Sequence, residues 1–562
     1  MVHTSALCSQ SQQDALDSIR TQFTISEDTL LDIAKTFLRE AAEGLASYGQ
    51  SMAMMYVLIV VANQAHTNIP QPDVRKTGST FLALDLGGTN LRVCEVTLHG
   101  DKTFSLRQQK YKVSEALKTG EVIALFDYLA DSVDTFLTDS GSPSNAIPPS
   151  LAPNGSHDAF LRDNSDLSYI PLALTFSFPV EQTALDSGTL LTWTKGFSAK
   201  NAIGKDIVKL LQDAFDRKHI HVRCVALVND TVGALLSRAY TSGGCILGAI
   251  FGTGTNGAYV EEVANITKLG IVPEAVEGGY MIVNTEWGAF NNTRSALPTT
   301  PYDNKLDRES INPRYQAFEK FISGMYLGEV ARNVILSFID ASPKPLLFGG
   351  NSAPSLNKQW GLDTAILSEI EEAWQGIGRF ASGQPSIAGA SDEEKLNHVR
   401  DVIVQRLGFT DPSQISLADA NVVRQICGIV VTRAARLSAC AVAAILVQTG
   451  RARCAGSVEI ALLVDEGKRI GVGVDGSLVE FYPRFESMMR ETLRALVGLE
   501  VEGRVDIGMA KDGSGAGAAL CALVAHKQNM AKQAHGAYSH DSITGPPQLR
   551  SVENYAYLTS MS

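Results

Sequence analysis

Hydrophobic positions at helical spacing mark two stretches of the chain. Apolar residues recur three or four positions apart over Leu30–Leu38, within a segment that is predicted to be helical from Ala15 to Leu45. Ser26 stands just before this pattern, where its side chain can cap the first backbone N–H groups. A second, mostly helical region is predicted over residues 313–447, interrupted by loops rich in Gly, Ser and Pro.

Strand-like patterns lie between and after these helical regions. Thr80–Asp85 and Leu91–Leu98 are apolar runs on either side of a Gly-Gly-Thr-Asn turn, which predicts a β-hairpin. Strands and helices then alternate to about residue 260, and strand signals return over Val458–Phe481. A Gly-rich turn and a helix of small residues follow at Ser514–His526. Ser140–Ser165 is rich in Pro, Ser, Asn and Gly, so a solvated loop is expected there.

Composition narrows the class of protein. A chain of 562 residues is too long for one core, so two lobes or more are expected, and 45% hydrophobic with 19% charged residues is typical of a globular protein. The net charge of −12 argues against nucleic-acid or acidic-membrane binding. The scattered cysteines lack any C-x-x-C pair, which favours a reducing compartment. The run Met52–Ala62 is shorter than the about 20 residues of a membrane span, and no secretory signal precedes it.

Four glycine-rich turns carry the first chemical signal. They lie in Leu84–Arg92, Ile250–Tyr259, Gly473–Val479 and Asp512–Ala519. Such turns offer backbone N–H groups to a phosphate, and the last one opens a helix whose N-terminus suits anions. Asp85 in the first turn can hold a hydrated Mg²⁺. Each turn alone is equally consistent with a simple hairpin, but four together indicate a duplicated lobe that clamps one nucleotide.

A dinucleotide-binding oxidoreductase is the main alternative from spacing alone. Gly252–Gly257 matches the spelling G-x-G-x-x-G, which in that class joins a strand to a helix. Here Ala258-Tyr259-Val260 continues as a strand, so the context does not fit. The sequence also lacks a G-x-x-x-x-G-K-[ST] loop.

Polar residues that could bind a polyhydroxylated ligand lie between the glycine-rich turns. They follow apolar strands or stand in aromatic surroundings, where each hydrogen bond increases discrimination. Singly, each such residue is more often a cap or turn former. As a set they are Ser177, Thr194, Lys195, Asn229, Asp230, Glu286 and Glu319.

These motifs together resemble the eukaryotic hexokinase family, and within it the fungal glucokinases, over Phe23–Ala525. The segments that carry the resemblance are Leu84–Arg92, Thr175–Pro179, Gly188–Phe197, Leu227–Gly233, Phe251–Tyr259, Asn284–Phe290, Phe318–Glu329 and Val474–Val479. The resemblance implies the α/β, actin-like ATPase (ribonuclease H-like) fold, with two lobes and the ligands in the cleft between them. The expected large lobe is 15–76 with 230–510 and the small lobe 77–229 with 511–526. Residues 1–14 would be an extension and 527–562 a disordered tail.

The resemblance also implies roles for individual residues. Asp230 matches the general base that accepts the proton of the sugar 6-hydroxyl, and Lys195 matches a cation near the transferred phosphate. The matching hexose contacts are Ser177, Thr194, Lys195, Asn229, Asp230, Asn256, Glu286 and Glu319. The matching nucleotide contacts are Asp85, Gly87, Gly88, Thr89, Asn90, Arg92, Thr253, Gly476, Ser477, Gly513 and Ser514. Mg²⁺ would arrive with ATP and be held largely through water, so no dedicated metal ligand is expected.

The implied activity is ATP-dependent phosphorylation of glucose, and of other hexoses, at the 6-hydroxyl, which is the first step of glycolysis. Two alternatives stay open: a catalytically silent sugar sensor, and a kinase of mannose, fructose or N-acetylglucosamine. The expected partners are D-glucose and other hexoses, without nucleic acid or a membrane span. The scattered cysteines and the N-terminal sequence predict a cytoplasmic protein, and a monomer or weak homodimer is expected.

Two insertions and the tail depart from the family pattern. An apolar segment within residues 55–68 and a second segment at 461–470 stand where relatives run almost directly on. Exposed apolar surface of that size promotes association. We therefore hypothesise that at least one insertion is absent from the working protein, which peptide mapping of native material would test.

Overall fold

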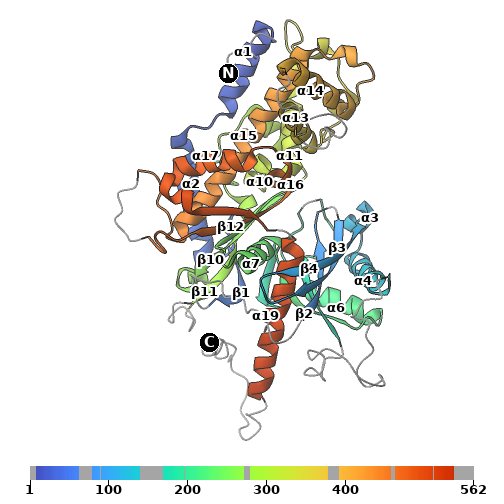
Figure 1. Ribbon diagram of the computed structural model, residues 1–562. Coiled ribbons are helices and arrows are strands. Elements are labelled where there is room, and N and C mark those ends of the chain that lie inside the picture. Colours follow the sequence, from blue (N-terminus) through green and yellow to red (C-terminus); the bar gives the residue numbers. More distant parts are fainter. Residues whose placement is uncertain are drawn as a thin grey trace.

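The structure is a computed structural model that describes residues 8–61, 79–88, 90–139, 169–194, 196–270, 279–377, 391–456, 463–510 and 512–536. Two β-sheets with helices packed on them organise these residues, and a helical region extends the larger half at its far end (Figure 1). Thr89, Lys195 and residues 140–165, for which the sequence made predictions, lie outside the described residues.

The smaller sheet has five strands in the order β4-β3-β2-β5-β8. Its strands are β2 (Ser79–Leu86), β3 (Asn90–Leu98), β4 (Phe104–Lys112), β5 (Ile170–Phe176) and β8 (Val222–Val228). β2, β3 and β4 are antiparallel, whereas β2, β5 and β8 are parallel. Residues of β2 alternate between two cores: Leu82 and Leu84 pack with α4 (Val122–Asp139) and α6 (Ile207–Arg217), while Phe81 and Ala83 belong to a second core on the opposite face.

The larger sheet has six strands in the order β1-β11-β10-β9-β12-β13. Its strands are β1 (Met55–Val61), β9 (Leu247–Phe251), β10 (Thr255–Glu262), β11 (Tyr280–Asn284), β12 (Ile470–Asp475) and β13 (Val505–Met509). β9, β10, β11 and β1 are antiparallel, and β9, β12 and β13 are parallel. Leaving β1 aside, this order and these directions repeat those of the smaller sheet. The duplication expected from the glycine-rich turns is therefore confirmed.

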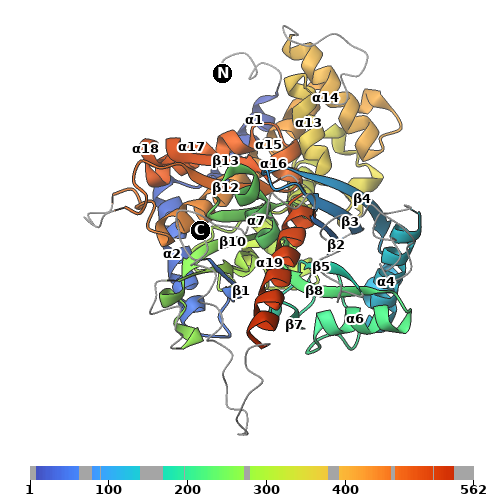
Figure 2. The same cartoon turned by 60° about the horizontal axis from the view of Figure 1, so that its bottom comes forward.

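Two helices connect the sheets. α7 (Asp230–Ser242) packs on β9 and β12 of the larger sheet, and α19 (Gly513–Gly536) packs on β2, β5 and β8 of the smaller one. α7 and α19 also pack against each other, and both views place them between the sheets (Figures 1 and 2). Gly233 and Gly517 make this approach possible, since a Cβ on Gly517 would lie 2.2 Å from the Cα of Gly233.

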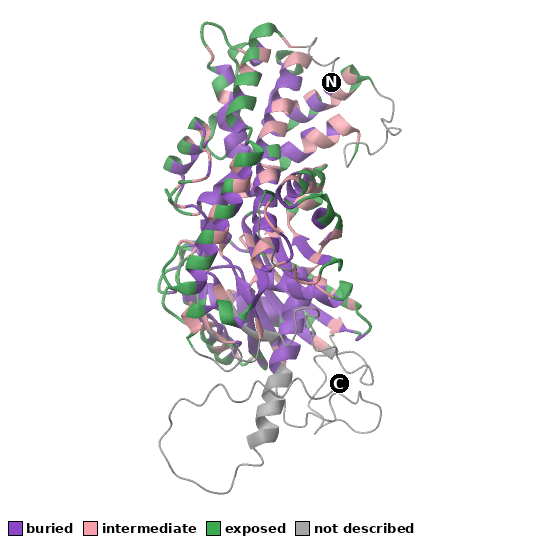
Figure 3. Cartoon of the chain, turned by 90° about the vertical axis from the view of Figure 1, so that its left-hand side faces the viewer, coloured by how far each residue is buried: buried purple, intermediate pink, exposed green. Residues whose placement is uncertain are grey.

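Helices cover the other face of the larger sheet. α1 (Gln10–Phe23) and α2 (Glu27–Ala46) form the predicted N-terminal helical region, and Ser26 caps α2 by accepting a hydrogen bond from the Thr29 N–H. The longest is α15 (Leu417–Gln448), which passes the length and apolarity criteria of a membrane span. Because 83% of its most apolar window is buried inside the protein, α15 is the central helix of this core. Buried positions concentrate along the strands and central helices (Figure 3).

Shorter elements complete the fold. They are α3 (Glu115–Thr119), β6 (Val180–Ala184), β7 (Ser187–Leu190), α9 (Pro301–Glu309), α10 (Ala317–Ile322), α11 (Gly324–Ile339), α12 (Pro354–Asn357), α13 (Ala365–Gln375), α14 (Asp392–Leu407), α16 (Ser477–Phe481), α17 (Phe485–Val497) and α18 (Leu499–Arg504). In the region of strand signals around Val458–Phe481, β12 ends at Asp475, and the predicted glycine-rich turn follows at Gly476 with a φ of 117°. The residues Ser477–Phe481 form a helix instead of a strand. α19 continues to Gly536, beyond the predicted helix end.

The apolar insertion supplies β1. Met55–Val61 pairs with β11 at the edge of the larger sheet, with an irregular register between Val57 and Val60. Strand pairing gives this segment backbone partners that an extended loop would lack. The segment from 62 to 68, like Ala461 and Leu462, lies outside the described residues. The hypothesis that an insertion is absent from the working protein stays a prediction.

Candidate active site

A polar cavity lies where both sheets contribute residues. The cavity is lined by Ser177, Pro179, Thr194, Asn229, Asp230, Ile250, Gly254, Thr255, Asn256, Glu286, Gln316 and Glu319. Every hexose contact expected from the sequence lines it, except Lys195, which is outside the described residues.

Asp230 is held at the start of α7. β8 ends at Val228, and Asn229 caps the helix by accepting hydrogen bonds from the N–H and the hydroxyl of Thr231 at 3.0 and 2.6 Å. Asp230 is therefore the first helical residue, where the helix dipole favours a negative charge. The buried Thr231 and Val232 fix the turn behind it. This position is suited to a carboxylate that exchanges a proton with a ligand in the cavity.

A chain of amides and a carboxylate forms another wall of the cavity. The Asn256 side-chain amide donates to Asn284 Oδ1 at 2.8 Å, and the Asn284 amide donates to Glu286 Oε1 at 2.9 Å. On helix α10, Glu319 Oε2 accepts from the Thr255 backbone N–H at 3.1 Å. These contacts fix the orientation of both carboxylates before any ligand arrives.

A buried aromatic residue supports this wall from behind. The Trp287 indole is fully buried, donates from Nε1 to the Thr255 hydroxyl at 2.9 Å, and stacks on Phe251. Gly257 permits the contact, because a Cβ there would lie 2.2 Å from the indole ring. The last glycine of the G-x-G-x-x-G spelling is thus required by packing.

The sequence did not single out five residues that line the cavity: Pro179, Ile250, Gly254, Thr255 and Gln316. Four of them lie within the motifs Thr175–Pro179 and Ile250–Tyr259, so considering every residue of each motif would have found them. Gln316 had no such signal. It precedes α10 in a left-handed conformation with a φ of 53°, and only the fold brings it beside Gly288.

The first glycine-rich turn is braced by an ion pair. Arg92 donates from Nε to Asp85 Oδ2 at 2.8 Å, and its Nη2 contacts both Asp85 and the Ser514 hydroxyl, the latter at 2.7 Å. The Gly87 N–H donates to the Asn90 carbonyl at 3.1 Å, which closes the turn. Asp85, Arg92 and Ser514 thus converge, although Ser514 follows Arg92 by more than 400 positions in the chain.

The ion pair with Arg92 limits the role of Asp85 as a ligand of a metal cation. Because Asp85 is paired with a guanidinium, direct coordination of a cation would have to compete with that ion pair. Among the described residues, no cluster of three His, Cys, Asp or Glu side chains could hold a metal ion. With one oxygen bound to Arg92, Asp85 fits a cation that would keep its own water, which Asp85 would hold by hydrogen bonding.

A second, larger pocket of about 660 Å³ adjoins the β9–β10 turn. It is lined by Thr253, Gly324, Met325, Trp360, Leu362, Asp363, Thr364, Ala365, Ser368, Glu369, Glu372, Ser477, Leu478 and Phe481. Thr253 and Ser477 lie in two of the glycine-rich turns, and the resemblance to the hexokinase family implied both as nucleotide contacts. Gly476 lies against the backbone of Phe251, where a Cβ would be 2.4 Å away, so the two turns meet at the pocket.

Asp475 ends β12 close to Asp230. Burial raises the pKa of the Asp475 carboxyl to about 6, and the Asp230 and Glu480 carboxylates add to the rise. The Gly476 N–H, which donates to Asp475 Oδ1 at 2.7 Å, and the Arg92 guanidinium act in the opposite direction. At pH 7 the protein therefore carries a buried carboxylate whose charged form is disfavoured.

Replacing Asp475 with Asn is expected to stabilise the fold at pH 7.5 but not at pH 4. Because the pKa of Asp475 is raised in the folded protein, its protonated form stabilises the fold fully below pH 3.8. This contribution to the free energy of unfolding is lost as the pH rises through about 6. The interval from 3.8 to about 6 corresponds to at most about 3 kcal/mol at about 1.4 kcal/mol per pH unit. Urea unfolding of both proteins at the two pH values measures the difference. Equal unfolding midpoints at pH 7.5 would contradict this assignment.

Comparisons with known proteins identify the class to which this fold and site belong. Hexokinase family models match residues 15–240 and 246–524. A glucokinase of Aspergillus niger is 39% identical over 514 residues, which cover 88% of this chain and 93% of the relative. A glucokinase of Saccharomyces cerevisiae is 35% identical over 548 residues, with 91% and 97% covered.

A solved structure agrees with these matches. The hexokinase from Schistosoma mansoni, complexed with glucose, superposes with a TM-score of 0.72 at 30% identity, covering 91% of this chain and 99% of that one. The two lobes and the repeated sheet order are those of the actin-like ATPase fold, as expected. The chain belongs to the hexokinase family.

Proposed function

We propose that the protein transfers the γ-phosphoryl group of ATP to the 6-hydroxyl of glucose. The observation that carries this proposal is the cavity in which Asp230 meets the amide and carboxylate wall, next to a pocket large enough for a nucleotide. The relatives named glucokinase and the glucose complex of the Schistosoma mansoni enzyme support the choice of sugar. The reaction would be the first step of glycolysis.

In this proposal Asp230 is the general base. Its carboxylate accepts the proton of the 6-hydroxyl while the sugar oxygen bonds to the γ-phosphorus and the bond from that phosphorus to the ADP oxygen breaks. The proton then leaves Asp230 for solvent, so the net products are the sugar 6-phosphate, ADP and a proton. Proton transfer of this kind contributes a factor of about 10²–10⁴. Lys195, outside the described residues, is proposed to stabilise the transferred phosphoryl group by its charge.

Sugar binding is proposed to use the remaining polar groups of the cavity. Donors and acceptors on several elements would hold the ring hydroxyls, and pre-fixed carboxylates discriminate sharply against a sugar that leaves one of them unpaired. The proposed hexose contacts are Ser177, Thr194, Asn229, Asn256, Glu286 and Glu319, together with Lys195 and Asp230. Gln316 joins this set because it lines the same cavity.

The nucleotide is proposed to span the two glycine-rich turns and the larger pocket. On the side of the smaller sheet, the phosphates would contact the first glycine-rich turn and the start of α19. The residues proposed there are Asp85, Gly87, Gly88, Thr89, Asn90, Arg92, Gly513 and Ser514. Thr253, Gly476 and Ser477 would meet it from the larger sheet. Bound Mg²⁺ supplies charge neutralisation on the phosphates, and Asp85 and Asp475 are the carboxylates that could hold its water.

A coupled assay of ADP release on glucose, mannose, fructose and N-acetylglucosamine tests the proposal. Glucose is expected to give the highest kcat/KM. Turnover that is best on another hexose would assign the enzyme to that sugar, and no turnover on any hexose would leave the sugar-sensor reading. A measurable glucose affinity by calorimetry would separate that sensor from a protein that does not bind sugar at all.

The remaining proposals concern the setting of the enzyme. We place the large lobe at residues 15–76 and 230–510 and the small lobe at 77–229 and 511–526, with α7 and α19 at their junction. Closure of the lobes on the sugar would exclude water from the γ-phosphoryl group. The eight cysteines are all free, as is usual in a reducing compartment such as the cytoplasm. We further propose a monomer or weak homodimer.

A further inference from the structure

An exposed tryptophan stands at the larger pocket. Trp360 lies in the loop between α12 and α13, keeps 38% of its surface exposed, and lines the pocket together with Thr253 and Ser477. By contrast, Trp287 is fully buried. The part of the Trp360 ring that stays exposed is removed from water only when a ligand covers it. That part of the ring is therefore available for binding.

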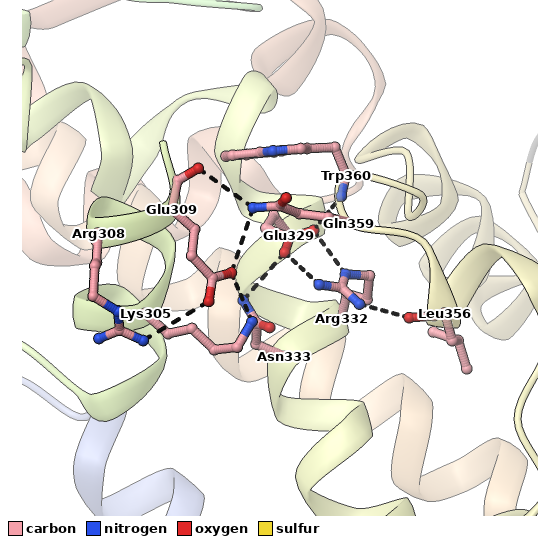
Figure 4. A network of polar contacts seen from close by, with 9 residues as sticks. All are labelled: Lys305, Arg308, Glu309, Glu329, Arg332, Asn333, Leu356, Gln359 and Trp360. Atoms are coloured by element: carbon pink, nitrogen blue, oxygen red, sulfur yellow. Dashed lines mark hydrogen bonds and ion pairs between the residues drawn. The ribbon is translucent and has the colours of Figure 1, made fainter. Parts of the chain in front are cut away.

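The backbone of Trp360 is held in an unfavourable conformation. Its φ is 59°, the left-handed region that residues with a side chain rarely adopt. The Trp360 N–H donates to Glu329 Oε2 at 2.8 Å, and Glu329 is itself buried on α11 (Figure 4). Strained backbone of this kind persists only when surrounding contacts enforce it, and it concentrates at ligand sites.

A buried ion pair enforces the conformation. Arg332 donates to both oxygens of Glu329, from Nε at 2.7 Å and from Nη2 at 2.6 Å. The remaining Arg332 nitrogen, Nη1, donates to the Leu356 carbonyl at 2.6 Å, on the N-terminal side of the same loop (Figure 4). The Tyr326 ring, also on α11, meets the indole edge to face with centroids 5.9 Å apart. One helix therefore fixes the loop at two points and the ring at a third.

The same helix is attached to the phosphate turn. At the start of α11, the Gly324 N–H donates to the Gly252 carbonyl at 2.8 Å and the Met325 N–H donates to the Thr253 carbonyl at 3.0 Å. Glu329 lies five residues after Gly324, which is about 7.5 Å along the helix axis. α11 thus sets a fixed spacing between the β9–β10 turn and the loop that carries Trp360.

We propose that Trp360 binds the base of the nucleotide by stacking, and that the Glu329–Arg332 pair positions it. This inference rests on the proposed kinase function, because it takes the phosphates to lie at Thr253 and Ser477. The pocket beyond these residues is lined by apolar side chains such as Leu362 and Leu478, which suit a flat base. An indole and a purine are attracted through their faces, largely independently of hydrogen bonding.

Titration calorimetry with ADP and with inorganic pyrophosphate tests the proposal on the full chain. Trp360→Ala is expected to weaken ADP binding about tenfold, as alanine substitution of a stacked aromatic ring does. Pyrophosphate has no base, so its affinity should be unchanged. Trp360→Phe should keep ADP affinity within about threefold of the wild type, because the smaller ring still stacks.

Two results would overturn the proposal. One is ADP binding by Trp360→Ala as tight as that of the wild type. The other is an equal loss for ADP and pyrophosphate, which would show a general distortion of the pocket. Trp374→Phe is the matched control, since Trp374 packs against Arg424 and does not line the pocket. Direct ADP binding also separates this test from the hexose assay, which can fail while Trp360 still binds the base.

Discussion

Replacing Asp230 with Asn should reduce kcat for hexose phosphorylation by a factor of about 10²–10⁴, the usual contribution of a general base. Asn has the shape of Asp but cannot accept the proton of the sugar hydroxyl. The Asn229 cap and the buried turn of Thr231 do not depend on the Asp230 carboxylate, so the site should keep its form. Glucose binding, measured by calorimetry, is therefore expected to stay within a few-fold of the wild type.

Asp206→Asn is a matched control for this change. Asp206 caps α6 by accepting from the Lys209 N–H at 3.0 Å, and it does not line the cavity. Asn is an equally good cap, so this variant should retain full kcat. Unchanged kcat in Asp230→Asn would remove Asp230 from the chemistry. A loss of glucose binding as large as the loss in kcat would instead make it a structural residue of the sugar site.

The parts of this site that could be predicted are those in which one short segment carries both the strand and the polar residue. β8 and Asn229-Asp230 are consecutive, so an apolar strand followed by an amide and a carboxylate already indicates a polar edge. The hairpin around Gly87 is equally local. A parallel pairing such as β9 with β12 joins residues more than 200 positions apart, and only the resemblance to a family implied it.

The parts that could not be predicted depend on long-range contacts. Gln316 enters the cavity because α10 and the Trp287 turn pack together, and no local pattern reports that packing. The position of Trp360 could not be predicted for the same reason. Its backbone N–H donates to Glu329, which a buried ion pair with Arg332 holds in place. The strand signals around Val458–Phe481 and the glycine-rich turn at Gly473–Val479 are found as β12 and the turn at Gly476. The residues after this turn form the short helix α16, which a short apolar run does not distinguish from a strand.

The helical core contains the largest single stability contribution that we expect. Arg433 on α15 is 1% exposed and donates from Nη1 and Nη2 to the two carboxylate oxygens of Asp303 on α9, both at 2.7 Å. Its guanidinium also lies over the rings of Phe23 and Phe321, at 4.4 and 4.7 Å. One side chain therefore connects α1, α9, α10 and α15.

Arg433→Met should lower the free energy of unfolding by about 3–5 kcal/mol, the usual loss when one partner of a buried ion pair is removed. Methionine can fill most of the space between the two rings, so the main loss is the uncompensated charge of Asp303. Asp303 also accepts from the Thr300 N–H at 2.8 Å, as the third helical residue in the capping box of α9. Urea unfolding followed by circular dichroism measures the effect.

The double variant Asp303→Asn with Arg433→Met distinguishes charge from packing. If the buried charge is the cause, the double variant should be more stable than Arg433→Met alone, since Asn can still cap α9 without carrying a charge. If both variants are equally unstable, the loss comes from the contacts of Arg433 with the two phenylalanines. Among the cavity residues, Glu319 shares α10 with Phe321, and the Thr255 N–H holds its carboxylate independently of Arg433. Enzyme that remains folded should therefore phosphorylate sugar at the wild-type rate in either case.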